Sequence, residues 1–179
     1  LFCYVDDTYG WEDEVNTMLY RPYNRHFPMK QALLLYLWDF LGIPHKCEKQ
    51  LFGFILVIIS FQVDPNAMTI TLPSESKEDL IRFIQHFILS PSRWRTLHKF
   101  QMLSGWVNWS FNVFPLLHPC LCNVYNKMKG KNRPDAPIYL NKAVKDDLTW
   151  FINHIRRSQG TLIFDGMDWN PYLECDMTI

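Results

Sequence analysis

The apolar positions at the start of the chain predict a strand that ends in two adjacent carboxylates. Residues 1–5 are apolar, and Asp6 and Asp7 follow them directly. Because the flanking residues are aromatic and β-branched and two acids suit a turn, the pattern predicts a β-hairpin over residues 1–12 with Val5-Asp6-Asp7 at its tip. Pro22 and Pro28 then predict an irregular stretch.

Strand-like and helical periods alternate along the rest of the chain. Apolar positions three and four residues apart predict a helix over residues 30–41, which Gly42 ends as a C-terminal cap. A β-like stretch, a turn and a returning strand follow at residues 51–63, 64–67 and 68–72. Further helices are predicted at 77–89, opened by a capping box of Ser76 and Asp79, at 96–113, at 116–128 and, capped by Asn141, up to 157. Short strands are predicted at 161–164 and 172–176.

Composition and charge change this picture in one respect. The chain of 179 residues is 48% hydrophobic and 16% aromatic, which is ample for a packed core, and its charges sum to zero. The charges are unevenly placed, since residues 1–20 contain acids but no Lys or Arg, and no acid lies between Pro91 and Arg133. The bases in that middle region are Arg93, Arg95, Lys99, Lys127, Lys129, Lys131 and Arg133. Such a region suits the phosphates of a nucleic acid, although clustering by chance on solvated faces gives the same pattern.

Cysteine content and hydropathy indicate an intracellular protein, in the cytoplasm or the nucleus. The five cysteines are odd in number and lack paired Cys-x-x-Cys spacing, so we expect reduced thiols and no zinc site. The most apolar run, residues 51–61, is far shorter than the ~20 residues that a membrane helix needs, so no membrane contact is expected. The chain begins in the middle of a predicted strand without Met, which suggests a piece of a longer protein.

Two motifs carry candidate chemistry. Asp6 and Asp7 are carboxylates that a hairpin tip would hold rigidly, as a two-metal site for phosphoryl transfer requires. A solvent-facing acidic turn is the plain alternative. In the helix after Pro91, Gln101, Gly105 and Trp109 recur every four residues and share one face. A hydrogen-bonding group, a gap and a stacking ring would suit the minor groove of a duplex, whereas packing of another helix against the glycine is the alternative.

Together these residues resemble a known family. Leu103-Ser104-Gly105-Trp106-Val107-Asn108-Trp109 followed by Phe114-Pro115 resembles the thumb helix of retroviral and retrotransposon reverse transcriptases, in which Gln-x-x-x-Gly-x-x-Asn-Trp follows the minor groove of the template–primer. Tyr4-Val5-Asp6-Asp7 resembles the Tyr-x-Asp-Asp motif of the same family, and the two motifs occur in the family's order. DIRS-like or related retrotransposons are the nearest type.

The resemblance implies an α+β fold and roles for individual residues. Residues 1–73 would be a partial palm of β-hairpins plus a helix, 74–130 a helical thumb, 131–170 a short connection and 171–179 the first strand of a truncated ribonuclease H domain. Asp6 and Asp7 would bind Mg²⁺ or Mn²⁺, Lys49 would protonate the leaving pyrophosphate, with Lys46 as a competitor, and Asp176 would be the first metal ligand of ribonuclease H. The residues expected to contact nucleic acid are Tyr4, Gln101, Gly105, Asn108, Trp109, Arg93, Arg95, Lys99, Lys127, Lys129 and Lys131.

The sequence also departs from the family pattern. Ser60 stands where a glycine is expected in the primer-grip hairpin, and Met177 and Thr178 replace the usual Ala-Ser after Asp176. The expected partners are an RNA or DNA template–primer and deoxynucleoside triphosphates. Because the fingers and the first palm carboxylate are not in this sequence, we expect no polymerisation by this chain alone. The alternatives are a non-catalytic relic or nucleic-acid-binding module derived from such an element, and an unrelated mixed helical domain.

Overall fold

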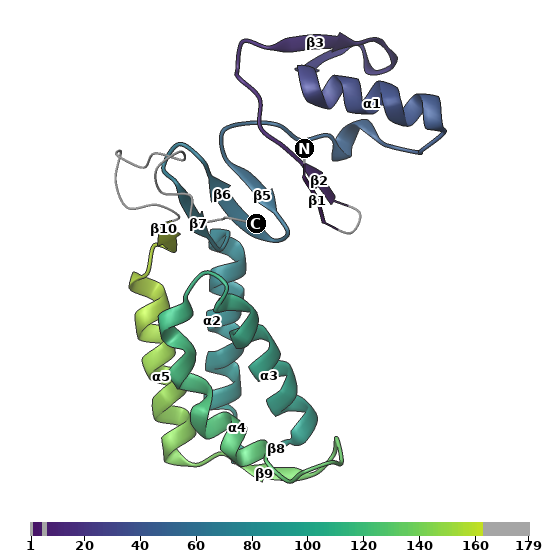
Figure 1. Cartoon of the computed structure of the whole chain (residues 1–179). Coiled ribbons are helices and arrows are strands. Elements are labelled where there is room, and N and C mark those ends of the chain that lie inside the picture. Colours follow the sequence, from purple (N-terminus) through teal and green to yellow (C-terminus); the bar gives the residue numbers. More distant parts are fainter. Residues whose placement is uncertain (1, 5–6, 163–179) are drawn as a thin grey trace, which may run out of the picture.

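The computed structural model describes residues 2–4 and 7–162 and shows a mixed α+β protein (Figure 1). Its described strands are β1 (Phe2–Tyr4), β2 (Asp7–Tyr9), β3 (Thr17–Tyr20), β4 (Arg25–Pro28), β5 (Leu56–Ile58), β6 (Phe61–Asp64), β7 (Thr69–Thr71), β8 (Trp94–Thr96), β9 (Pro137–Tyr139) and β10 (Thr161–Leu162). The helices are α1 (Met29–Leu41), α2 (Ser74–Leu89), α3 (Leu97–Ser110), α4 (Cys122–Met128) and α5 (Lys142–Arg157), with 3-10 turns η1 (Arg21–Tyr23), η2 (Cys47–Lys49) and η3 (Pro115–Leu121). The α+β prediction is confirmed.

The N-terminal part holds two hairpins and α1, and the β3–β4 hairpin and α1 enclose a small core of Tyr20, Phe27, Ala32 and Leu35. The expected hairpin is present, since β1 and β2 pair with Tyr4 opposite Asp7. The expected helix is also present, and Gly42 ends α1 in the left-handed conformation at φ 71°. The prediction of an irregular stretch at Pro22 and Pro28 is wrong, because β3 and β4 form a second hairpin there. Both prolines are tolerated: Pro22 lies in the first turn of η1, and Pro28 at the end of the ladder.

A polar cluster joins this hairpin to the segment after α1. The hydroxyl of the fully buried Tyr20 donates to Asp39 Oδ2 at 2.5 Å, and His45 Nε2 lies 3.0 Å from Asp39 Oδ1. The hydroxyl of Tyr23 lies 2.6 Å from His45 Nδ1. The hydrogen bond from Tyr20, aided by His45, lowers the pKa of Asp39, while burial raises the pKa of Tyr20. These bonds hold the residues after α1 against β3.

A four-stranded antiparallel sheet, in the order β10–β7–β6–β5, lies between the N-terminal part and helices α2 to α5 (Figure 1). The prediction of one β-like stretch over residues 51–63 is wrong, because residues 51–55 form no strand and the rest folds into a hairpin at Ile59 and Ser60. Ile59 and Ser60 both have positive φ, 49° and 68°, as in the two-residue turns that favour Asn and Gly. Ser60 therefore occupies a backbone conformation that favours glycine, the residue that the resemblance leads us to expect there.

The last described strand, β10, forms the edge of the sheet next to β7. Thr161 pairs with Ile70 of β7, and its hydroxyl donates to the carbonyl oxygen of Val113 at 2.5 Å. Gly160 precedes it at φ 111°, where an added Cβ would fall against the Ile70 carbonyl and 2.8 Å from Thr71 Cβ. Only glycine fits this approach of two backbones without strain. The short strand predicted at 161–164 is thus present at residues 161–162, and the strand predicted at 172–176 lies outside the described residues.

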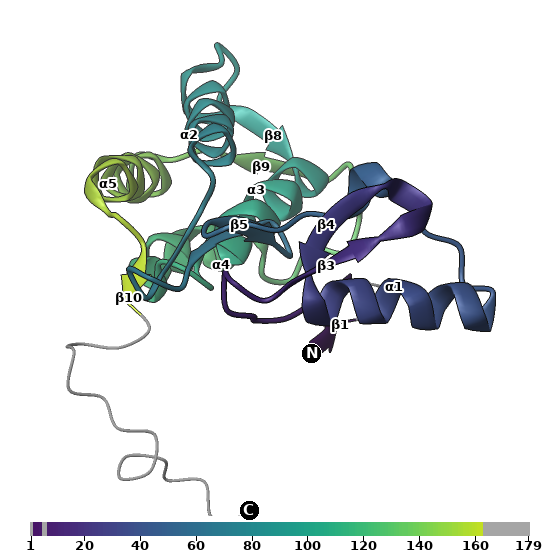
Figure 2. The same cartoon turned by 90° about the horizontal axis from the view of Figure 1, so that it is seen from above.

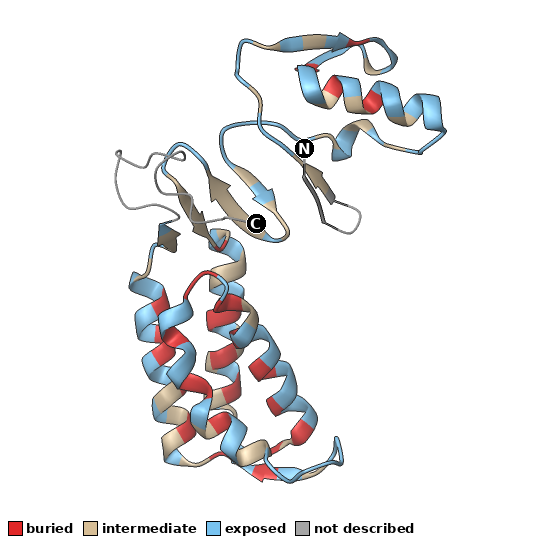
Figure 3. Ribbon diagram, in the orientation of Figure 1, coloured by how far each residue is buried: buried red, intermediate tan, exposed pale blue. Residues whose placement is uncertain are grey.

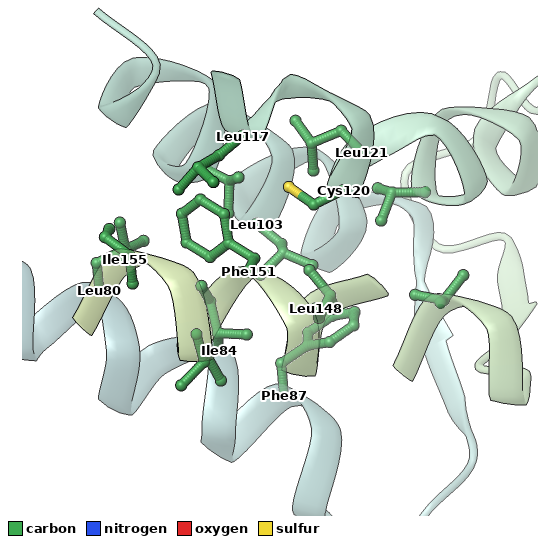
Figure 4. Close-up of a cluster of buried hydrophobic side chains, with 14 of the residues drawn as sticks. Leu80, Ile84, Phe87, Leu103, Leu117, Cys120, Leu121, Leu148, Phe151 and Ile155 are labelled. Atoms are coloured by element: carbon green, nitrogen blue, oxygen red, sulfur yellow. The ribbon is translucent and has the colours of Figure 1, made fainter. Parts of the chain in front are cut away.

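Helices α2, α3, α4 and α5 enclose the main core, and Figure 3 shows that their inner faces are buried. In Figure 4, side chains of α5 point toward α2 on one side and toward η3 on the other (Figure 4). Leu148 and Phe151 of α5 are fully buried in the same core as Leu103 of α3. The helix predicted to end at residue 157 therefore completes the bundle.

Several helix boundaries differ from the prediction. α2 begins at Ser74 without a capping side chain, so the capping box expected at Ser76 is wrong and Ser76 lies inside the helix. The helix expected at 116–128 opens as the 3-10 turn η3, because Pro119 has no N–H to donate to an α-helical carbonyl. The predicted cap of α5 is confirmed, since Asn141 Oδ1 accepts from Val144 N. α3 also has a cap, which was not predicted, since the Thr96 hydroxyl accepts from Lys99 N.

An unexpected two-stranded ribbon closes the end of the bundle that lies away from the sheet (Figures 1 and 2). β8 and β9 pair with Trp94 opposite Tyr139, Arg95 opposite Ile138 and Thr96 opposite Pro137. The segment before β9 returns to α3, because His98 N donates to the Pro134 carbonyl and Leu97 N to the Ala136 carbonyl. Among the described helices, none has the length and apolar content to cross a membrane.

Candidate nucleic-acid interface

Of the three expected metal ligands, the structure describes only Asp7. Asp6 and Asp176 are outside the described residues, and for Tyr4 and Asp7 the structure describes the backbone alone. Tyr4 and Asp7 face each other at the last pair of the β1–β2 ladder, directly beside the two-residue connection. The backbone therefore places Asp7 where a hairpin tip was predicted.

The chemistry of these carboxylates suits a hard divalent cation. Aspartate oxygens are the ligands that Mg²⁺ and Mn²⁺ prefer, and two adjacent aspartates at a turn would supply two of them. Within residues 2–4 and 7–162, no three His, Cys, Asp or Glu side chains gather into a metal-binding group. The role of Asp6 and Asp7 in binding Mg²⁺ or Mn²⁺ stays a prediction.

Lys49 and its competitor Lys46 lie together after α1. Lys49 ends the 3-10 turn η2, its N–H donates to the Lys46 carbonyl at 3.2 Å, and both side chains are exposed. Their exposure leaves both ammonium groups accessible to solvent. The proton-donating role of Lys49 stays a prediction.

The expected minor-groove residues form an open stripe on α3. Gln101, Gly105 and Asn108 are exposed on one side of the helix, while Leu103 and Val107 are fully buried on the other. A Cβ added at Gly105 would meet no atom within 4 Å. Among residues 2–4 and 7–162, no other helix therefore packs against this glycine, contrary to the alternative interpretation. We call Gln101, Gly105 and Asn108 the open stripe.

Trp109 has a structural role that the sequence did not reveal. Its ring stacks on Phe61 of β6 with centroids 4.8 Å apart and planes 18° apart, and both residues are half-buried against the main core. Trp109 thus fastens the four-stranded sheet to α3. Its neighbour Trp106 is 49% exposed beside Gly105 and touches Phe83 of α2 at a centroid distance of 5.0 Å.

We expect Trp109→Ala to lower the free energy of unfolding by about 2 kcal/mol, because a large ring leaves a half-buried contact. In a double-mutant cycle with Phe61→Leu, the stack should contribute a coupling energy of about 1 kcal/mol. Urea denaturation measures both values, and Trp106→Ala, which leaves the sheet contact intact, is the matched control. Additive effects of the Trp109 and Phe61 changes would contradict the assignment.

The structure corrects the role of Arg95. Only 6% of Arg95 is exposed, and its guanidinium donates to the carbonyls of Phe87 and Trp94 at 2.9 Å, to that of Ser90 at 3.4 Å and to that of Ser92. These carbonyls belong to the last turn of α2 and the segment that follows it. Because its donors are committed to buried or partly buried carbonyls, Arg95 does not serve as a phosphate contact, contrary to the sequence prediction.

The other expected cations remain accessible. Arg93, Lys99, Lys129 and Lys131 are exposed and Lys127 is half-buried. The loop that carries Lys129 and Lys131 leaves α4 and returns to the start of α3 through the bond between His98 and Pro134. The N-terminal end of α3 therefore has lysines close in the fold to the end of the open stripe that Gln101 occupies, an arrangement that can attract a polyanion.

Comparison with protein-family models, curated proteins and solved structures finds no significant match to this chain. Two features were not predicted from the sequence: the outward-facing pair of Trp94 and Tyr139, and the position of Trp106 beside the open stripe. A strand-like run at residues 94–96 was the available signal for the pair, but Tyr139, the partner of Trp94 in the ladder, lies 45 residues further along the chain.

Proposed function

We propose that this chain is part of a retrotransposon reverse transcriptase and that α3 binds the template–primer duplex through its open stripe. The observation that supports this most is the empty space at Gly105 between exposed Gln101 and Asn108. A glycine in a helix costs about 1 kcal/mol relative to alanine, and here no neighbouring element of the described chain accounts for that cost. Close approach of the duplex backbone to this side of α3 would explain why glycine occupies the position.

The polymerase activity in this proposal depends on Asp6 and Asp7. They would hold the metal ions that activate the primer hydroxyl and neutralise the pyrophosphate that leaves a deoxynucleoside triphosphate. We assign no residue of this sequence to the remaining palm carboxylate. The alternative function is a non-catalytic module of the same origin that retains duplex binding.

Replacing Gly105 with leucine separates the fold from the binding surface. Because the new side chain projects into open space and leucine favours helices, the variant should be at least as stable as the wild type. Its affinity for a short RNA–DNA duplex should fall about tenfold or more, since the side chain blocks close approach of the groove. Fluorescence anisotropy with a labelled duplex measures this, and thermal unfolding measures stability.

The matched control is Asn153→Leu, which places the same side chain on an exposed position of α5. It should leave duplex affinity unchanged. The logarithm of the affinity for a DNA duplex should also fall with the logarithm of salt concentration, with a slope between about −2 and −4.5 if two to five cations contact phosphates. Equal binding by the Gly105 variant and the wild type, or no salt dependence, would remove the support for this surface.

A further inference from the structure

The outer face of the β8–β9 ribbon carries an aromatic pair with no packing role in the core. In the antiparallel register, Arg95 and Ile138 face inward and are 6% and 1% exposed. Trp94 and Tyr139 form the neighbouring pair and face outward, 58% and 37% exposed. Inward residues close the bundle, so the two outward rings are not needed for that purpose.

The contact between Trp94 and Tyr139 leaves a face of the Trp94 ring uncovered by its partner. The centroids of Trp94 and Tyr139 lie 5.4 Å apart with their planes at 68°, so they touch edge to face rather than covering each other. Arg93 Nη1 donates to the Tyr139 hydroxyl at 3.0 Å, which holds an exposed guanidinium beside the pair. An indole face next to a fixed cation is suited to stack a planar group that carries negative charge nearby.

The charges around the ribbon favour a polyanion. Between Leu80 and Lys145 the only acidic residue in the sequence is Asp135, and Arg133 Nη2 pairs with it at 2.7 Å. Exposed Arg93 adjoins the aromatic pair, and exposed Lys129 and Lys131 lie in the loop that leads into the ribbon. A proline-rich peptide would not require these cations, and a second copy of a chain with zero net charge has no overall charge complementarity to them.

We propose that the outer face of the β8–β9 ribbon binds single-stranded nucleic acid, with a base stacked on Trp94 and phosphates at Arg93 and the loop lysines. A single strand is the form that fits, because base faces in a duplex are covered by their neighbours and cannot stack on a side chain. This site lies at the end of the bundle away from the sheet (Figure 1). It does not depend on the duplex-binding function proposed for the open stripe.

Trp94→Leu in the full 179-residue chain tests the site. Its affinity for fluorescein-labelled oligothymidylate should fall about tenfold or more, because stacking on one ring contributes an effect of that size. Affinity for a blunt duplex should not change, which distinguishes this site from Gly105. Trp94→Tyr keeps an aromatic ring and should restore most of the binding. Trp150→Leu, at another exposed tryptophan on α5, is the matched control and should bind like the wild type.

Photo-crosslinking with a 5-iodouracil oligonucleotide locates the contact directly, and Trp94 or Tyr139 should carry the adduct. The proposal is overturned if Trp94→Leu folds normally and binds oligothymidylate like the wild type, or if Trp150→Leu loses as much affinity. Adducts confined to other segments would also overturn it. So would self-association of the chain that Trp94→Leu abolishes, with no effect on oligonucleotide binding, because a second copy would then be the partner.

Discussion

Replacing Arg95 with methionine should lower the free energy of unfolding by about 3 kcal/mol. The guanidinium serves the carbonyls of Phe87, Ser90, Ser92 and Trp94, and methionine has no donor for any of them. A buried carbonyl left without a partner costs about 1–3 kcal/mol, and part of that cost is recovered where water can reach the exposed end of the segment. The methionine retains much of the apolar stem, so the loss reports on the hydrogen bonds rather than on volume.

Arg93→Met is the matched control, since Arg93 is two residues away and exposed. It should cost no more than about 0.5 kcal/mol, as surface changes do. Urea denaturation of both variants gives the comparison. A loss for Arg95→Met as small as that for Arg93→Met would show that the carbonyls find other partners and would reopen the possibility of a phosphate-binding role for Arg95.

Asp7→Asn should abolish detectable primer extension by the full reading frame that encodes this chain, with Mg²⁺ or Mn²⁺ present. The asparagine keeps the shape of the side chain but removes a negative charge that the proposed metal ions require. Losing one fixed electrostatic group commonly costs about 100-fold in rate or more, and a metal ligand should cost at least as much. Asp6→Asn should behave in the same way.

Asp13→Asn is the control for this change, because Asp13 is an exposed acid in the segment after β2 and has no assigned role. It should leave extension unchanged. Extension by Asp7→Asn at the wild-type rate would exclude the catalytic role. A wild-type protein that does not extend primers but binds duplex in a Gly105-dependent way would favour the non-catalytic alternative.

Local signals predicted a substantial part of the fold. The hairpin at Asp7, the end of α1 at Gly42 and the starts of α3 and α5 all follow from turn propensities and caps that act within a few residues. The predictions that failed needed information from further away. Pro22 and Pro28 predict an irregular stretch, yet they lie in a hairpin, at positions where a missing N–H is tolerated.

The candidate sites likewise combine features that the local sequence predicted with features that it did not. Helical periodicity alone placed Gln101, Gly105 and Trp109 on one face of a helix. Only the tertiary structure shows that Gln101 and Gly105 are left open, whereas Trp109 stacks on Phe61. Charge alone grouped Arg95 with Arg93. Alternation along the ribbon turns Arg95 into the bundle, whereas Arg93 precedes β8, lies outside the ladder and stays exposed.

The sequence by itself determined the α+β class, the caps, the hairpin with its two adjacent carboxylates and the periodic face of α3, because these depend on interactions between near neighbours in the chain. Only the tertiary structure decided that α5 completes the bundle, that Trp109 fastens the sheet, that Arg95 is structural and that Trp94 meets Tyr139. Each of these depends on a contact between distant segments, whose partner and register local sequence does not specify.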